Sequence, residues 1–94
     1  RFASQLFASL LLELPEHRRA FTTAWLANDY PSLATSAHRL AGAVAYCDLP
    51  ELSAALAGLE RTLREGDEAA LPQAYNLASR ELDALLEKSG LRES

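Results

Sequence analysis

The sequence has little of what defines several common classes of protein. Its single cysteine, Cys47, excludes an internal disulfide framework and a cysteine-rich zinc site, and it favours a reducing compartment. No apolar run approaches the roughly 18 residues that span a bilayer. Basic residues are also outnumbered, nine against thirteen acidic ones, and the formal net charge of −4 argues against nucleic acid or anionic lipid as the main partner.

The 94 residues are enough for one small domain, over residues 1–94. Hydrophobic residues make up 49% and charged residues 23%, so the chain can bury a core and is not a disordered tail. Because the chain begins with Arg1 and contains no methionine, we expect it to be a segment of a longer protein.

Helical spacing of the apolar residues predicts an all-α fold. Glycine and proline occur only four times each, and strand-type alternation is absent. We expect helices over residues 2–14, from there to about 28, 30–47, 50–65 and 72–89, the first broken or kinked at Pro15. Such helices with short connections fold most simply as an up-and-down antiparallel four-helix bundle with an additional or kinked N-terminal helix.

Local signals predict where several helices begin and end. Asp29 is the expected N-cap of a helix that carries Pro31 in its first turn. Residues 48–51, with the sequence DLPE, have the pattern of a capping box at the start of the next helix. Gly66 and Gly90 are expected to end the last two helices.

The helix predicted over residues 30–47 has an unusual surface. At about 100° per residue, His38 lies about 130° from the centre of the apolar stripe, so its imidazole should reach solvent. Glycine in a helix costs about 1 kcal/mol relative to alanine, so Gly42 indicates a surface kept open for a partner. The positions that share the His38 face are all small: Ala34, Thr35, Ala41, Gly42 and Ala45.

An exposed neutral imidazole is a good nucleophile near neutral pH, and an open surround suits acceptance of a group from a second macromolecule. The sequence has no glycine-rich phosphate loop and no evident acidic cluster around His38 to hold Mg²⁺. We therefore expect no autonomous catalytic activity and no metal site in this domain.

Residues 38–43 (HRLAGA), followed by 46–52 (YCDLPEL) and by Leu59-Glu60, closely resemble the histidine-containing phosphotransfer (HPt) domain. The resemblance covers about residues 6–86 and is strongest to the HPt modules at the C-terminal end of hybrid sensor histidine kinases of the BarA/GacS type. It implies that His38 is the phosphoacceptor. It would take a phosphoryl group from an aspartate of one response-regulator receiver domain and pass it to an aspartate of another.

The resemblance also implies that the domain holds no cofactor and that Mg²⁺ is supplied by the partner receiver domain. The expected location is cytoplasmic, including the cytoplasmic part of a membrane-anchored sensor kinase. We expect a monomer that contacts neither membrane nor nucleic acid.

Two residues depart from the family pattern. Ala41 stands where the family usually has lysine, or in this subgroup often histidine, so Arg39 becomes the candidate for electrostatic support of the phosphoryl group. Asp48 stands where the family favours glycine, which the predicted capping box explains. The five small residues around His38 are then the access surface for the partner.

Two alternatives stay open. Ala41 favours an HPt-like four-helix module that binds receiver domains without being phosphorylated. A structural or dimerising helical bundle is the other, and it predicts that a second copy buries the small-residue face, so that solvent does not reach His38.

Overall fold

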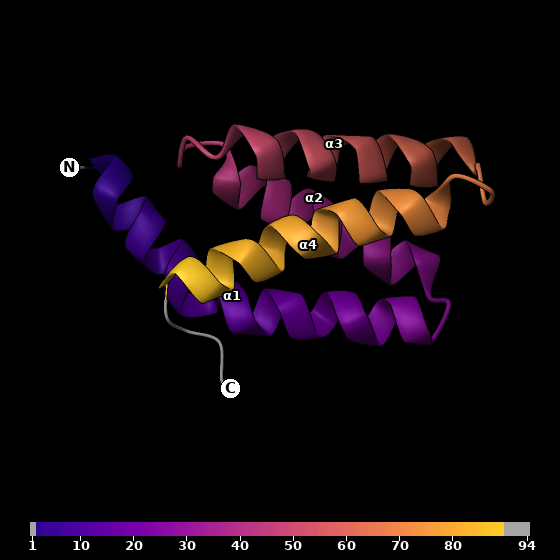
Figure 1. The fold of residues 1–94 in the computed structure, drawn as a ribbon, viewed down its shortest axis with the longest axis horizontal. Coiled ribbons are helices and arrows are strands. Elements are labelled where there is room, and N and C mark those ends of the chain that lie inside the picture. The colour runs from indigo at the N-terminus through magenta and orange to yellow at the C-terminus, as the bar shows by residue number, and fades with distance from the viewer. Residues whose placement is uncertain (1, 90–94) are drawn as a thin grey trace.

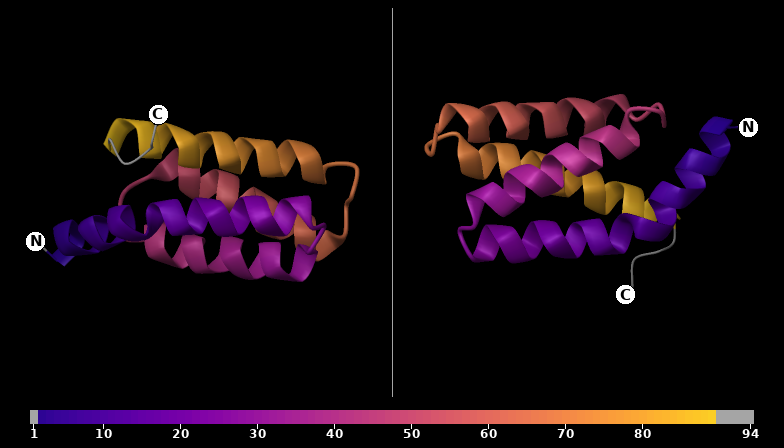
Figure 2. Two further views of the ribbon diagram at one scale, coloured as in Figure 1. Left: turned by 90° about the horizontal axis from the view of Figure 1, so that it is seen from below. Right: turned by 180° about the vertical axis from the view of Figure 1, so that it is seen from behind.

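The computed structural model describes residues 2–89, without the side chains of residues 2–4 and 6. It contains four helices: α1 (Phe2–Leu26), α2 (Tyr30–Val44), α3 (Pro50–Glu65) and α4 (Leu71–Ser89). They run alternately up and down, each packs against the next, and α4 closes the ring against α1 (Figures 1 and 2). No strand occurs among these residues, and the predicted all-α up-and-down bundle is confirmed.

The N-terminal region is one kinked helix, not two separate ones. Helix α1 continues through Pro15, but its first, indigo part turns away from the bundle axis in Figure 1. A proline ring removes the backbone N–H that would bond the carbonyl one turn earlier, at Leu11, and it also crowds that carbonyl. Of the two arrangements that the sequence allows, the kinked one is therefore found.

Left-handed residues end α1 and α3. Gly66 has a φ of 68°, and the N–H groups of residues 66 and 67 bond the carbonyls of Leu63 and Thr62, which is a Schellman motif. Asn28, with a φ of 54°, ends α1 in the same way. Asp29 then caps α2 as predicted, because its carboxylate accepts hydrogen bonds from the Ser32 N–H and hydroxyl at 3.2 and 2.7 Å. Gly90 lies outside the described residues.

The predicted capping box at residues 48–51 is wrong. The N-cap of α3 is Leu49, and no side chain caps this end of the helix. Asp48 has a φ of 52°, in the left-handed region, whereas an N-cap residue needs extended backbone angles. The chain uses Asp48 to turn out of α2, and the left-handed angle is a physical reason for glycine to be favoured at this position.

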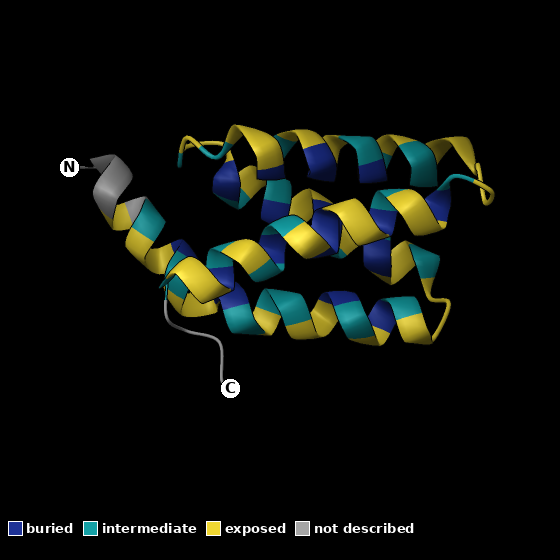
Figure 3. Cartoon of the chain, viewed as in Figure 1, coloured by how far each residue is buried: buried dark blue, intermediate teal, exposed yellow. Residues whose placement is uncertain are grey.

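The core lies between the four helices and is built from one apolar face of each (Figure 3). The predicted stripe of α2 is confirmed at four buried positions, and Cys47 at its end is half-buried. In α4, Leu85 is half-buried and Leu86 lies in the core. In the N-terminal part of α1, Leu10 and Leu14 are buried, while the side chains of Phe2 and Leu6 lie outside the description.

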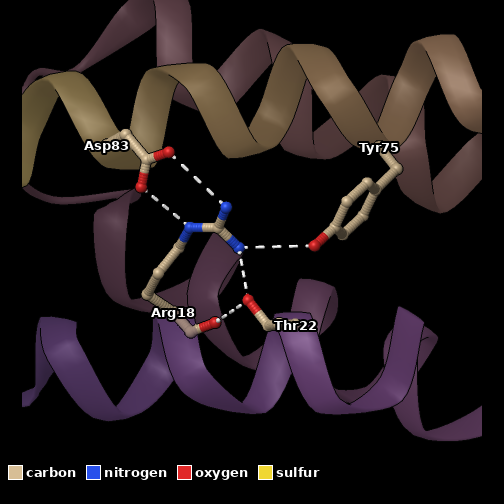
Figure 4. Close-up of polar contacts among 4 residues, drawn as sticks. All are labelled: Arg18, Thr22, Tyr75 and Asp83. Atoms are coloured by element: carbon tan, nitrogen blue, oxygen red, sulfur yellow. Dashed lines mark hydrogen bonds and ion pairs between the residues drawn. The ribbon is translucent and has the colours of Figure 1, made fainter. Parts of the chain in front are cut away.

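A polar cluster ties α1 to α4 (Figure 4). The Arg18 guanidinium donates to the Asp83 carboxylate at 2.8 and 3.5 Å and to the hydroxyls of Thr22 and Tyr75 at 2.9 and 3.3 Å. Partial burial lowers the pKa of Arg18, but the hydrogen bonds with Asp83 and Tyr75 raise it, and the net direction is upward. The Tyr75 ring also stacks on Trp25, with centroids 4.3 Å apart. This side of the bundle is held by specific directional contacts.

Candidate functional site

His38 projects from the middle of α2 into solvent. Its neighbours Ala37 and Leu40 are fully buried, whereas 84% of the His38 side chain is exposed. The expectation from the helical wheel, that the imidazole reaches solvent, is confirmed. Within residues 2–89 no other segment of the chain covers the ring, so a partner can reach it directly.

A carboxylate orients this imidazole. The Nδ1 atom of His38 lies 3.0 Å from Oε1 of Glu60 on α3, and the Glu60 side chain is 22% exposed. A carboxylate can only accept, so Nδ1 must carry the proton and donate it. The Nε2 atom of a neutral ring is then left with its lone pair available, which is the state a nucleophile needs.

His38 and Glu60 lie in an open groove between α2 and α3. Two cations, Arg39 from α2 and Arg64 from α3, line the same groove, and both are exposed. Neither guanidinium forms an ion pair or hydrogen bond with another described residue. Two arginines and one carboxylate leave a net positive charge beside the imidazole, which suits an anionic group. The remaining lining residues are Tyr30, Pro31, Ala34, Thr35 and Leu63.

The five small residues around His38 fall into two sets. Ala34 and Thr35 line the groove, and the Thr35 hydroxyl donates to the Pro31 carbonyl at 3.1 Å, so it folds back on the helix. The other three continue along α2 beyond His38. A Cβ at Gly42 would meet no atom within 4 Å, so packing inside the domain does not require glycine there. Ala41 is half-buried, whereas Ala45 is exposed.

Two charged residues of the groove were not given a role from the sequence. Glu60 belongs to the Leu59-Glu60 pair on which the family resemblance rests, and its place one residue after a buried leucine indicates a flank of α3. Arg64 follows it by one helical turn and therefore lies on the same flank. Locating either residue beside His38 requires the relative register of α2 and α3, which the sequence does not give.

The other reactive side chains lie apart from this site. His17 on α1 is 15% exposed, and its Nε2 lies 3.7 Å from the Glu13 carboxylate. The Cys47 thiol donates to the Ala43 carbonyl at 3.5 Å, and burial raises the pKa of that thiol. In the described part of the chain, no three His, Cys, Asp or Glu side chains are grouped so that they could hold a metal ion.

Comparison with known proteins agrees with this geometry. The family model of the Hpt domain matches residues 5–89, so the chain belongs to the Hpt domain family and has a histidine phosphotransfer role in two-component signalling. Over 65 residues it is 40% identical to a sensor histidine kinase, GacS of Pseudomonas protegens. The match covers 69% of this chain and 7% of that protein. No solved structure matches the chain. None of the described helices is apolar over enough length to cross a membrane.

Proposed function

We propose that His38 is the phosphoacceptor of a phosphorelay, which takes a phosphoryl group from the aspartate of one receiver domain and passes it to the aspartate of another. The observation that carries this proposal is the exposed His38 ring, hydrogen-bonded at Nδ1 to Glu60 at 3.0 Å. Hpt domains work with receiver domains in two-component systems, and the open groove gives a receiver direct access to Nε2.

Transfer to His38 is an in-line displacement at phosphorus. The Nε2 lone pair forms the N–P bond while the P–O bond to the receiver aspartate breaks, and the departing carboxylate keeps that electron pair. The proton stays on Nδ1, so the phosphorylated ring is an imidazolium cation bonded to the Glu60 carboxylate. Glu60 is thus a positioning residue that also stabilises positive charge on the ring.

Transfer out of the domain reverses these changes. A carboxylate oxygen of the second receiver attacks phosphorus, the N–P bond breaks, and Nε2 regains its electron pair to give neutral imidazole. Because the proton is held on Nδ1 throughout, no proton has to move in either direction. Both steps use the same groove, so one surface serves the donor and the acceptor receiver in turn.

The family usually has a basic residue at the position of Ala41. In this proposal the two groove arginines supply that positive charge instead. Arg39 and Arg64 lie on opposite walls and are without ion-pair partners among residues 2–89. Their guanidinium groups can donate charge-assisted hydrogen bonds to phosphoryl oxygens. The Mg²⁺ that the reaction needs belongs to the receiver, and the domain acts as a cytoplasmic monomer.

The test is phosphoryl transfer from purified receiver domains labelled with radioactive acetyl phosphate. The proposal expects acid-labile, base-stable label on the wild-type chain and none on His38→Gln. His17→Gln is the matched control and should be labelled like the wild type. Label that persists on His38→Gln would overturn the assignment. Binding of several competent receivers without any label would instead support the alternative that Ala41 favours, an HPt-like module that is not phosphorylated.

A further inference from the structure

One large aromatic side chain near the site is left exposed. Tyr46 lies two residues beyond the end of α2 and is 68% exposed, whereas Tyr75 is buried and Tyr30 is half-buried in the groove wall. No hydrogen bond or ring contact holds the Tyr46 side chain within the described chain. Its backbone is nevertheless fixed, because Ala45 keeps helical angles of −58° and −26° and the Cys47 N–H bonds the Val44 carbonyl.

Tyr46 lies on the His38 side of α2. Helical geometry places it about 80° around the axis from His38 and about 12 Å along it, with Gly42 midway. Since no described atom lies within 4 Å of a Cβ at Gly42, the surface between the imidazole and the phenol ring is open within residues 2–89. A partner domain that packs on this stretch of α2 contacts both His38 and Tyr46.

A partner of typical interface size that centres on His38 extends far enough along α2 to contact Tyr46. A standard interface covers about 800 Å² on each partner, which corresponds to a disc of about 16 Å radius. Tyrosine is one of the residues most often found to dominate binding energy, because its ring buries a large area at a small cost in side-chain entropy. An exposed ring that is offset from the nucleophile by about 12 Å along the helix axis is well placed for binding and too distant for chemistry.

We propose that Tyr46 is an anchor for the receiver domain, and that its ring packs on apolar receiver side chains at a distance from the reacting aspartate. The inference rests on the proposed function, because the receiver is the partner that must approach His38. Tyr46 acts on affinity and His38 on transfer, so substitution separates the two. Losing the ring raises the receiver concentration needed for half-maximal transfer about tenfold and changes the rate at saturation less than twofold.

The experiment is single-turnover transfer from a receiver labelled with acetyl phosphate, measured over a range of receiver concentrations. Tyr46→Ala is compared with Tyr46→Phe, which keeps the ring, and with Leu77→Ala as the matched control. Leu77 is 48% exposed on α4, which does not contact α2 within residues 2–89. The expected result is weaker half-saturation for Tyr46→Ala alone, with circular dichroism spectra unchanged in all three variants.

An unchanged half-saturation in Tyr46→Ala overturns the anchor, and so does a fall in the saturated rate with unchanged half-saturation. An equal loss in Leu77→Ala also overturns it, because the effect is then not confined to the His38 side. These outcomes leave the phosphoacceptor intact, since the wild-type chain is still labelled. Absence of label on the wild-type chain with every receiver overturns the proposed function itself, and the anchor with it.

Discussion

Replacing Gly42 by glutamine should stabilise the domain and slow its reaction at the same time. Gly42 lies inside α2, where glycine costs about 1 kcal/mol relative to alanine and glutamine costs much less. A Cβ at this position meets no atom within 4 Å, so no clash opposes the gain. The free energy of unfolding should rise by about 0.7 kcal/mol, which raises the Tm of a domain of this size by about 3–6 °C.

The same substitution places a long polar side chain one turn from His38, on the surface that a receiver must approach. Displacement of the reacting atoms by about 1 Å can cost about a hundredfold in rate. We expect transfer to the variant to slow by about tenfold or more, measured with the labelled receiver, while thermal denaturation shows the higher Tm. Because stability and transfer change in opposite directions, partial unfolding cannot account for the loss.

Gly58→Gln is the matched control. Gly58 lies inside α3, does not line the groove, and also has no atom within 4 Å of an added Cβ. It should show the same rise in Tm and unchanged transfer. The reasoning is refuted if Gly42→Gln transfers at the wild-type rate, or if Gly58→Gln loses as much transfer, because the open surface at Gly42 is then not what admits the partner.

Three further predictions concern single side chains. Glu60→Ala removes the acceptor that holds the proton on Nδ1 of His38, so single-turnover transfer should slow about threefold to tenfold. Its Tm should stay within about 2 °C, because one hydrogen bond from a solvent-exposed imidazole contributes little to stability; an unchanged rate would contradict the positioning role. Asp48→Gly removes the energetic cost of the left-handed backbone angle at this position and should raise the Tm by about 4–8 °C in thermal denaturation. A fall would show that the Asp48 side chain stabilises the turn. Cys47 should be alkylated by iodoacetamide severalfold more slowly than a free thiol at pH 8, because its raised pKa lowers the thiolate fraction, and equal rates would contradict burial as the cause.

The sequence was informative where structure is set by neighbours along the chain. The caps at Asp29 and Gly66 depend on residues within five positions, so they follow from local rules. The exposure of His38 follows equally from the periodicity of α2. The capping-box prediction failed at Asp48 because one acidic residue suits both an N-cap and a left-handed turn. The path of the backbone after α2 decides between the N-cap and the left-handed turn, and this path cannot be read from the sequence pattern.

The parts of the site that could not be predicted depend on how helices pack side by side. Glu60 is 22 residues from His38, and Asp83 is 65 residues from Arg18. Each pair meets only because of the rotation and offset of two helices, which many side chains determine together. The sequence therefore predicted the exposure of His38 but neither the carboxylate that orients its ring nor the second groove arginine, Arg64.

One side of the bundle stabilises the fold and the other carries the candidate site. This division explains how so small a domain can stay folded with an open, charged site on its surface. On the α1 and α4 side, the Arg18 cluster and the stacked rings of Tyr75 and Trp25 hold two helices by contacts that need exact geometry. On the α2 and α3 side, the polar side-chain contact between the two helices among the described residues is the His38–Glu60 pair in an open groove. Because the core and the α1–α4 contacts supply stability, the domain can tolerate unpaired arginines on the α2–α3 side and the cost of about 1 kcal/mol at Gly42.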